Sequence, residues 1–313
     1  MAERVDIGLV CGGARAAAHV AAIAQVPEAR LLGMCGADAG EATRLAKAGK
    51  AQAFGTLDAM LECDDLDLVI VASPPKQQTA HAQAALAAGR HAWLDPPSVG
   101  SRTAWRRLEA AAAKAGVEVA MAFTARHIPN ARALRQTCAE GKLGPLAMAR
   151  YELRVPRHAA PGALEAELAQ AIDLVCWLTD KAAHGVFATT SPHIPNHLSV
   201  HLVLDDNAIG TVDVHLAPPG QAKAFPPREH LVVVGTKGTR RAGTSFKRKL
   251  RLGSEQPLAG MAEALRQMVR HVRGTAPPPA PPDGAAAVLD AVVAALRSAR
   301  SGQPVATKLG RNG

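Results

Sequence analysis

The first 123 residues alternate short apolar runs with longer alanine-rich segments, and this alternation limits the fold more than any other feature of the chain. The predicted strands are residues 5–11, 29–35, 66–72, 92–94 and 117–122. The predicted helices are residues 15–25, 40–47, 57–62, 78–88 and 102–115. Strands and helices in this order, several strands being apolar throughout, predict a doubly wound parallel sheet of the Rossmann type.

The pattern changes after residue 123. One helix is predicted at 129–140, and the strand-like stretches that follow are residues 147–154, 186–190, 198–204, 210–215 and 230–234. This order predicts an α+β domain on a largely antiparallel sheet. A proline-rich stretch precedes a strongly apolar helix at 283–301, which must pack back on the protein. We therefore expect two domains, residues 1–123 and 124–313.

Composition excludes several classes of protein. No apolar run approaches the length of about 20 residues that a bilayer span requires, and the N-terminus lacks the layout of a secretory signal, so we expect a cytoplasmic protein without a membrane partner. The net charge is +9. The densest basic stretch, residues 237–251, contains one aromatic residue, Phe246, so it predicts a solvated hairpin rather than a nucleic-acid surface.

The five cysteines are odd in number and form no CxxC pair, which predicts reduced thiols rather than a disulfide framework or a zinc site. One alternative stays open. Cys11 and Cys35 end strands that would be neighbours in the sheet, close enough for a disulfide hypothesis. His193, His197 and His201 recur every four residues, but Pro195 interrupts a helical spacing, so we predict no metal site.

The candidate cofactor site begins where the first predicted strand meets the first helix. Gly12, Gly13, Ala14, Arg15 and Ala16 occupy the place of the glycine-rich turn that binds a dinucleotide pyrophosphate. Backbone amides at the start of the helix hold an anion there, and Arg15 adds positive charge. The preceding residue, Cys11, replaces the usual first glycine, which weakens the predicted binding without excluding it.

The second predicted strand departs from the pattern as well. An acidic residue that holds the adenosine ribose is expected at its end, but Gly36 stands there and Asp38 follows two positions later. No arginine that would favour a 2′-phosphate lies beside it, since Ala37 takes that position. The sequence therefore leaves NAD and NADP open as the cofactor.

Several stretches in this order resemble the Gfo/Idh/MocA family of oxidoreductases. They are residues 7–19, 64–75, 85–97, 122–129, 141–144, 172–178 and 235–238. The resemblance implies an NAD(P)-dependent enzyme that moves hydride to or from sugars, cyclitols and related small polar substrates. It adds Ser73, Pro74, Pro75 and Asp95 to the cofactor-binding residues. It also implies a homodimer or homotetramer that associates through the exposed sheet of the second domain.

The family's catalytic residues are absent. Where the family has Glu-Lys-Pro, this chain has Asp95-Pro96-Pro97, and proline donates no proton. Where the family has a histidine three residues before an aspartate, this chain has Gln170 before Asp173. An amide orients a hydroxyl group but takes no proton from it at neutral pH. Gln78 replaces a further family histidine after the third predicted strand.

Two interpretations remain open. In the first, hydride transfer persists with non-standard residues, and the catalytic candidates are Asp95, Gln170, Asp173 and Arg126. Further groups able to act on a proton or an anionic substrate are Glu165, Glu167 and His127. In the second, the chain is a catalytically silent ligand-binding, partner-subunit or regulatory protein that keeps the dehydrogenase fold.

Overall fold

A computed structural model describes residues 4–12, 15–96, 100–156, 162–218, 224–245, 255–279 and 282–307. The chain divides into two compact units, Met1–Thr124 with Glu255–Ala286, and Ala125–Ser254 with Ala287–Gly313. Each unit therefore contains segments that are distant in the sequence. Within the described ranges, no helix has the length and apolar character needed to cross a membrane.

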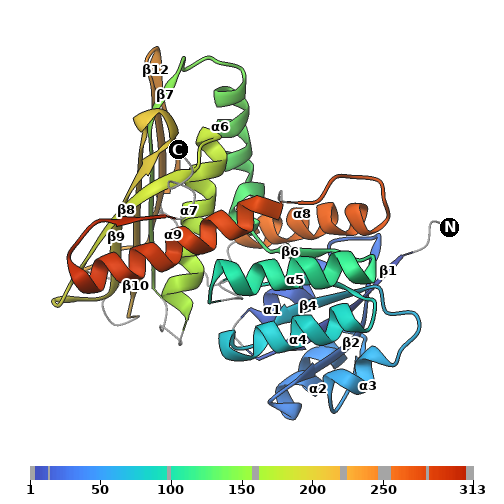
Figure 1. Ribbon diagram of the computed structural model, residues 1–313. Coiled ribbons are helices and arrows are strands. Elements are labelled where there is room, and N and C mark those ends of the chain that lie inside the picture. The colour runs from blue at the N-terminus through green and yellow to red at the C-terminus, as the bar shows by residue number, and fades with distance from the viewer. Residues whose placement is uncertain are drawn as a thin grey trace. The chain divides into compact units, whose positions relative to one another are not determined.

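The first unit is built on a parallel sheet of six strands in the order β3-β2-β1-β4-β5-β6 (Figure 1). The strands are β1 (Val5–Cys11), β2 (Ala29–Gly36), β3 (Gln52–Ala53), β4 (Leu68–Ala72), β5 (His91–Leu94) and β6 (Val119–Met121). The helices of the alternating part are α1 (Ala16–Ile23), α2 (Ala39–Gly49), α3 (Leu57–Leu61), α4 (Pro75–Ala87) and α5 (Arg102–Ala115). This confirms the predicted Rossmann fold. The short strand β3 was missed, because two exposed residues carry no periodic pattern.

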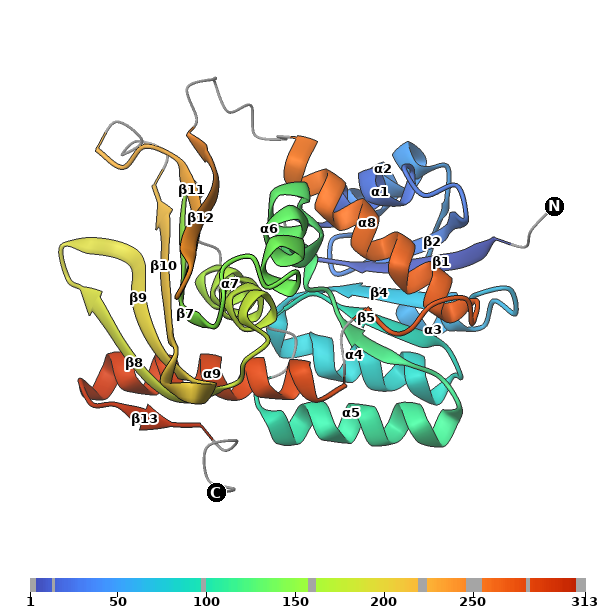
Figure 2. The same cartoon turned by 90° about the horizontal axis from the view of Figure 1, so that it is seen from above.

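Helices cover both faces of this sheet, as Figure 2 shows: α4 and α5 lie on one side, and α1 and α2 on the other. The second side also carries α8 (Glu255–Val272), which the sequence interpretation missed. Its Leu265, Met268 and Val269 are fully buried in one cluster with Ile7 and Leu9 of β1. A segment that follows the second domain's strands in sequence therefore completes the core of the first, and no local pattern reveals such a return.

The second unit is built on a seven-stranded sheet in the order β12-β11-β7-β10-β9-β8-β13. Its strands are β7 (Leu146–Pro156), β8 (Ala183–Ser191), β9 (Ile194–Leu204), β10 (Ile209–Ala217), β11 (Arg228–Gly235), β12 (Gly238–Ser245) and β13 (Val305–Ala306). Its helical elements are η1 (Thr124–His127), α6 (Pro129–Ala139), α7 (Ala163–Thr179), η2 (Asp205–Asn207) and most of α9 (Pro282–Ser301). Only the β7–β10 pair is parallel among the described ladders, which confirms the predicted, largely antiparallel sheet.

The two faces of this sheet differ in chemistry. One face packs against α7, whose Ile172 and Val175 are fully buried, and α7 approaches so closely that a Cβ at Gly210 of β10 would lie 3.0 Å from Val175 Cγ1. The opposite face, here called the outer face, carries alternate residues of the same strands, such as Arg150 of β7 and Asp213 of β10. In Figure 2, α6 and α7 lie together on the first face. Period-2 alternation thus divides apolar from polar residues as a one-sided sheet requires.

Two sequence interpretations are tested by this fold. The basic stretch begins as the predicted hairpin, since β11 and β12 pair antiparallel across Gly235 and Gly238, while its residues 246–251 lie outside the described residues. Cys11 and Cys35 are both buried free thiols, so the disulfide alternative is wrong for this structure. Burial raises the pKa of Cys35 to about 12, which leaves its thiol protonated and unreactive at neutral pH.

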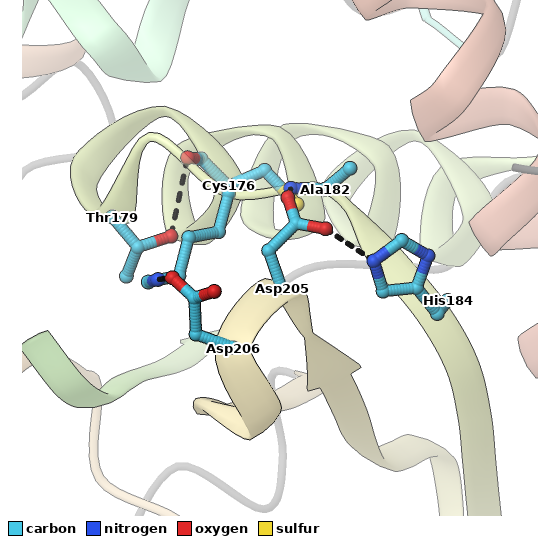
Figure 3. A network of polar contacts seen from close by, with 7 residues as sticks. Cys176, Thr179, Ala182, His184, Asp205 and Asp206 are labelled. Carbon is cyan, nitrogen blue, oxygen red and sulfur yellow. Dashed lines mark hydrogen bonds and ion pairs between the residues drawn. The ribbon is translucent and has the colours of Figure 1, made fainter. Parts of the chain in front are cut away.

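A polar network ties the end of α7 to the turn between β9 and β10 (Figure 3). Asp205 accepts a hydrogen bond of 2.7 Å from the backbone N–H of Ala182 and pairs with His184 at the start of β8. Its neighbour Asp206 pairs with Lys181 at 2.6 Å but is 87% exposed. Burial opposes ionisation, yet the Ala182 amide and His184 hold the pKa of Asp205 below its usual value.

We predict that Asp205→Asn lowers the free energy of unfolding at pH 7 by about 1 kcal/mol, because the ion pair with His184 is lost and the bond from Ala182 is weakened. A depressed carboxyl pKa stabilises the fold above the unfolded value of about 3.9 and ceases to do so as the pH falls through the folded value. The difference from the native protein should therefore shrink in acid, measured by urea unfolding between pH 7 and pH 3. Asp206→Asn is the matched control, and an equal loss in both variants would contradict the assignment.

Candidate functional site

The phosphate-loop region lies at the carboxyl end of β1. Gly12 needs its lack of a side chain, because a Cβ there would lie 2.7 Å from Cδ of Pro74, the residue that precedes α4. Ala16 is fully buried and begins α1, and the N-cap residue Arg15 makes no side-chain capping bond. Uncapped backbone amides at a helix start suit an anion. Gly13 and Ala14 lie outside the described residues.

Asp95, at the end of β5, is the centre of a buried charged cluster. Its carboxylate lies 3.0 Å from Nε2 of His19 and 3.2 Å from Nε of Arg15, both contributed by the start of α1. His19 is fully buried, with its ring edge-on to Trp93. Burial alone would raise the pKa of Asp95, but Arg15 and His19 outweigh it and hold the pKa below the usual range. The cluster therefore orients Arg15 at the phosphate loop.

The ends of β1 and β2 show why the ribose-binding acid is missing. Cys11 and Gly36 are register partners. A Cβ at Gly36 would lie 2.6 Å from the backbone oxygen of Cys11 and 2.7 Å from its Sγ, distances that require a shift of the backbone. The two departures from the family pattern are therefore physically coupled, because the thiol of Cys11 fills space that a larger residue 36 would need. Asp38 instead caps α2, accepting a 3.0 Å bond from the N–H of Glu41.

Ser73 follows β4, Pro74 precedes α4 and Pro75 is its first residue, so the predicted cofactor-binding residues of this strand share the edge of the sheet that holds Gly12. Ser73 Oγ lies 2.8 Å from Nδ1 of His81, and the Ser73 carbonyl accepts a bond from the side chain of Gln78. Burial lowers the pKa of His81, which favours the neutral ring. Gln78 thus has a structural contact in the place of the family histidine.

The remaining predicted catalytic residues meet inside the second unit. Gln170 of α7 is buried, and its Oε1 accepts a 3.1 Å bond from the backbone N–H of Ala125. Asp173, one turn later, is fully buried and contacts Arg126 of η1 through two bonds, one of 2.6 Å from Nε. Burial raises the pKa of Asp173 against the opposing effect of Arg126. Asp173 and Arg126 satisfy each other and hold η1 against α7.

A second acidic group, which the sequence interpretation missed, lies between α7 and the sheet. Tyr151 of β7 donates a 3.0 Å hydrogen bond to Glu229 of β11. Burial raises the pKa of Glu229, Tyr151 opposes that rise, and the nearby Glu167 adds to it. Glu167, one of the further candidates named from the sequence, is therefore electrostatically coupled to a half-buried acid. A carboxyl group held toward its protonated form is a candidate proton donor.

Three further points complete the placement of the predicted residues. His19 and His81 were missed as partners of Asp95 and Ser73, although the four-residue spacing of Arg15 and His19 places both on one helix face and signals their shared partner. His197 of β9 pairs with Asp213. Within the described ranges, no three histidine, cysteine or acidic side chains gather as a metal site would require.

The strand order and the close approach of Gly12 to Pro74 define a fold of the Rossmann dinucleotide-binding type. Residues 5–123 match the family model GFO_IDH_MocA, described as the oxidoreductase family with an NAD-binding Rossmann fold. The match to this family model covers the first domain and agrees with the resemblance seen in the sequence. A comparison with curated proteins gave no match.

Solved structures match along nearly the whole chain. GenD2 from gentamicin A biosynthesis, in complex with NAD, is 26% identical with a TM-score of 0.87, covering 98% of this chain and 97% of its own. Myo-inositol dehydrogenase from Lactobacillus casei, in complex with NAD(H) and myo-inositol, is 17% identical with a TM-score of 0.83, covering 97% of each chain. The WlbA dehydrogenase from Bordetella pertussis, in complex with NADH and UDP-GlcNAcA, is 20% identical with a TM-score of 0.82, covering 98% of each chain. The last two likenesses establish the fold.

We predict that Asp95→Asn lowers the free energy of unfolding by about 2 kcal/mol, because the buried His19 loses its charged partner and has no access to water. The loss should be smaller than for a fully buried pair, since the side chain of Arg15 is 22% exposed. The change should also weaken NADH binding, since Arg15 loses its orientation. Chemical unfolding and a fluorescence titration measure the two effects. Asp180→Asn, at a pair that is 83% exposed on the aspartate, is the control and should cost less than about 0.5 kcal/mol. Equal losses of stability in Asp95→Asn and Asp180→Asn would contradict the role assigned to the Asp95 cluster.

Proposed function

We propose that this protein is an NAD-dependent oxidoreductase that acts on a small sugar-like substrate with non-standard proton-transfer residues. The observation that carries the proposal is the retained dinucleotide scaffold: Gly12 packed against Pro74, an uncapped α1, and Arg15 held by Asp95. The 26% identity to GenD2, which is bound to NAD, supports the same cofactor. Relatives bound to myo-inositol and UDP-GlcNAcA support a polyhydroxylated substrate.

The chain's own residues fit a dinucleotide at its phosphate groups. The backbone around Gly12 and the first amides of α1 bind the pyrophosphate, and Arg15 neutralises part of its charge. Ser73, Pro74 and Pro75 lie at the same edge of the sheet. When bound, the nicotinamide supplies or accepts the hydride. Everything else in the reaction falls to side chains that orient the substrate and handle a proton.

We further propose that the cofactor is NAD rather than NADP. Asp38 and Glu41 both raise the pKa of Cys11, after the larger effect of burial, so their carboxylates act at the end of β1. A 2′-phosphate brought to the end of β2 would meet this negative charge, and Ala37 offers no cation to offset it. Since Gly36 lacks a side chain, Asp38 is the acidic residue that would hold the ribose hydroxyls, through the carboxylate oxygen that does not cap α2.

The proton must come from a residue other than Pro96 or Gln170. Pro96 is buried and has nothing to donate, and Gln170 is engaged by the Ala125 amide. We propose Glu229 as the proton donor of the second unit, because burial and Glu167 raise its pKa and the hydrogen bond from Tyr151, which opposes that rise, fixes the position of its carboxyl group. Asp95, Asp173 and Arg126, the other candidates, act as positioning residues in buried ion pairs.

One observation favours the alternative of a catalytically silent binding protein. Asp95, Asp173 and Arg126 are each paired within their own unit, and Pro96 and Gln170 replace the family's proton-transfer groups. Cofactor binding tolerates these changes, while proton transfer does not. In this alternative the protein binds NAD and a polar ligand without converting that ligand, and acts as a regulatory protein or a partner subunit.

We propose that the protein forms a homodimer or homotetramer in the cytoplasm through the outer face of the second sheet. Val203 of β9 and Ile209 of β10 are register partners on that face, and they are 51% and 50% exposed. They are the exposed large hydrophobic residues of the described chain. Apolar side chains left on one face of a sheet suit a partner sheet.

The first experiment is a titration with NADH and NADPH followed by fluorescence. We expect NADH to bind and NADPH to bind at least about tenfold more weakly, because like charges at Asp38 and Glu41 oppose the phosphate. Asp38→Asn should narrow the gap while preserving the α2 cap, since asparagine also caps helices. Asp58→Asn on α3 is the charge-matched control. If neither NADH nor NADPH binds at millimolar concentration, the oxidoreductase proposal is wrong.

The second experiment restores the family's residues. Pro96→Lys combined with Gln170→His should raise turnover on a panel of cyclitols, sugars and nucleotide sugars by about tenfold or more, since a positioned acid or base contributes at least that factor. The control is Pro96→Met combined with Gln170→His, because methionine is similar in length to lysine but lacks the amine. Turnover by the native chain that falls on Glu229→Gln, with NADH affinity unchanged, supports the enzyme. Clear NADH binding with no turnover in any variant favours the silent binding protein.

A further inference from the structure

A cavity of about 550 Å³ lies in the first unit, at the amino ends of strands β2, β3 and β4. It is lined by residues 30–32 of β2, by residues 50–52 around the start of β3 and by residues 63–65 before β4. Gly12 and Ser73 of the proposed cofactor site instead follow the carboxyl ends of β1 and β4. Because these strands are parallel, the two sites lie at opposite edges of one sheet. The volume falls within the range of small-molecule sites.

The two acidic residues of the lining, Asp64 and Asp65, occupy the centre of a restrained turn, here called the acidic turn. A hydrogen bond of 3.2 Å from the N–H of Leu66 to the carbonyl of Cys63 closes this turn. The guanidinium group of Arg90 donates to the carbonyls of Cys63 and Asp64, at 3.1 and 3.2 Å. The backbone of the acidic turn is therefore fixed, while both carboxylates are exposed.

The two basic residues of the lining, Arg30 on β2 and Lys50 after α2, are here called the basic pair. Asp6 of β1 accepts a 2.6 Å bond from Nε of Arg30 and also pairs with Nη2. These contacts fix the guanidinium group and leave its Nη1 without a partner in the described chain. Leu31 and Leu32 add apolar surface, and Leu31 is buried.

The basic pair and the acidic turn do not neutralise each other. Asp6 raises the pKa of Arg30, burial opposes that rise, and Asp65 adds to it, so the Asp65 carboxylate acts on the guanidinium group across the cavity. Among the described residues, however, no ion pair or side-chain hydrogen bond engages Lys50, Asp64 or Asp65. The cavity therefore keeps two cations apart from two carboxylates. A ligand that carries one group of each charge matches both sets.

We propose that this cavity binds a free α-amino acid with an apolar side chain. The carboxylate of the ligand pairs with the basic pair, its ammonium group pairs with the acidic turn, and its side chain packs on Leu31 and Leu32. Guanidinium groups match carboxylates in paired hydrogen bonds, which favours this orientation. Equal numbers of cations and carboxylates suit a zwitterion better than a phosphate compound or a polyamine. The site is independent of the proposed function, because it shares no residue with the proposed cofactor site.

Calorimetric titration of the full chain with L-leucine tests the proposal, with N-acetyl-L-leucine and L-leucinamide as matched probes. The first analogue lacks the ammonium group and the second lacks the carboxylate, while both keep the side chain. We expect L-leucine to bind and each analogue to bind at least about tenfold more weakly, since each loses a charge-assisted contact. Titrations with and without saturating NADH should agree, so the result does not depend on cofactor binding.

Two variants assign the contacts. Asp65→Asn should weaken L-leucine binding by about tenfold and leave N-acetyl-L-leucine unaffected, because that analogue has no ammonium group. Lys50→Gln should weaken L-leucine binding similarly and leave L-leucinamide unaffected. The controls, Asp58→Asn on α3 and Lys47→Gln on α2, remove the same charges from exposed residues outside the lining, and affinity should stay within about twofold.

Three results would overturn the proposal. They are no heat with L-leucine at millimolar concentration, analogues that bind as tightly as L-leucine, and control variants that weaken binding as much as Asp65→Asn and Lys50→Gln. Equal weakening by the controls would mean that diffuse charge acts without a site. Lys50 and Asp65 are exposed, so their replacement should leave the thermal unfolding temperature unchanged, which separates loss of binding from loss of fold.

Discussion

The buried carboxylate of Asp95 is the constraint around which the cofactor end of the first unit is arranged. A charge removed from water is tolerated only when it is paired, and Asp95 meets this condition with His19 and Arg15. The pairs join the end of β5 to the first turns of α1, which follows the phosphate loop. Asp95 therefore acts on the loop through its partners. Sequence reasoning placed Asp95 among both the catalytic and the cofactor-binding candidates, and we propose that it acts as a positioning residue.

The departures from the family pattern fall into two physical groups. Cys11 and Gly36 form one group, because the thiol and backbone of the first leave no room for a Cβ at the second. Pro96 and Gln170 form the other, since both lack a group able to move a proton at neutral pH. The first group alters how a ribose is held, and the second alters the chemistry. A scaffold that keeps the residues proposed to bind phosphate but lacks the family's proton-transfer groups is consistent with either the enzyme or the silent binding protein.

The second unit has two features that its sequence pattern did not predict. Its inner face places the half-buried Glu229 against Tyr151 and close to Glu167, so a strand residue becomes an acid with a raised pKa. Its outer face brings Arg150 and Arg241 to either side of Val232 from strands separated by about 90 residues of sequence. Both arrangements depend on strand register, which places residues side by side according to pairing rather than to sequence distance.

Periodicity by itself determined the Rossmann sheet, the position of the phosphate loop and the mixed sheet that follows, because alternation and helical spacing are local properties of the chain. The motifs indicated the resemblance to the Gfo/Idh/MocA family and the departures from it at Pro96 and Gln170. Only the tertiary structure decided that α8 returns to complete the first core, that His19 and Asp95 meet across 76 residues, and that Asp173 is neutralised by Arg126. These outcomes depend on burial, where the cost of an unpaired charge selects partners from anywhere in the chain.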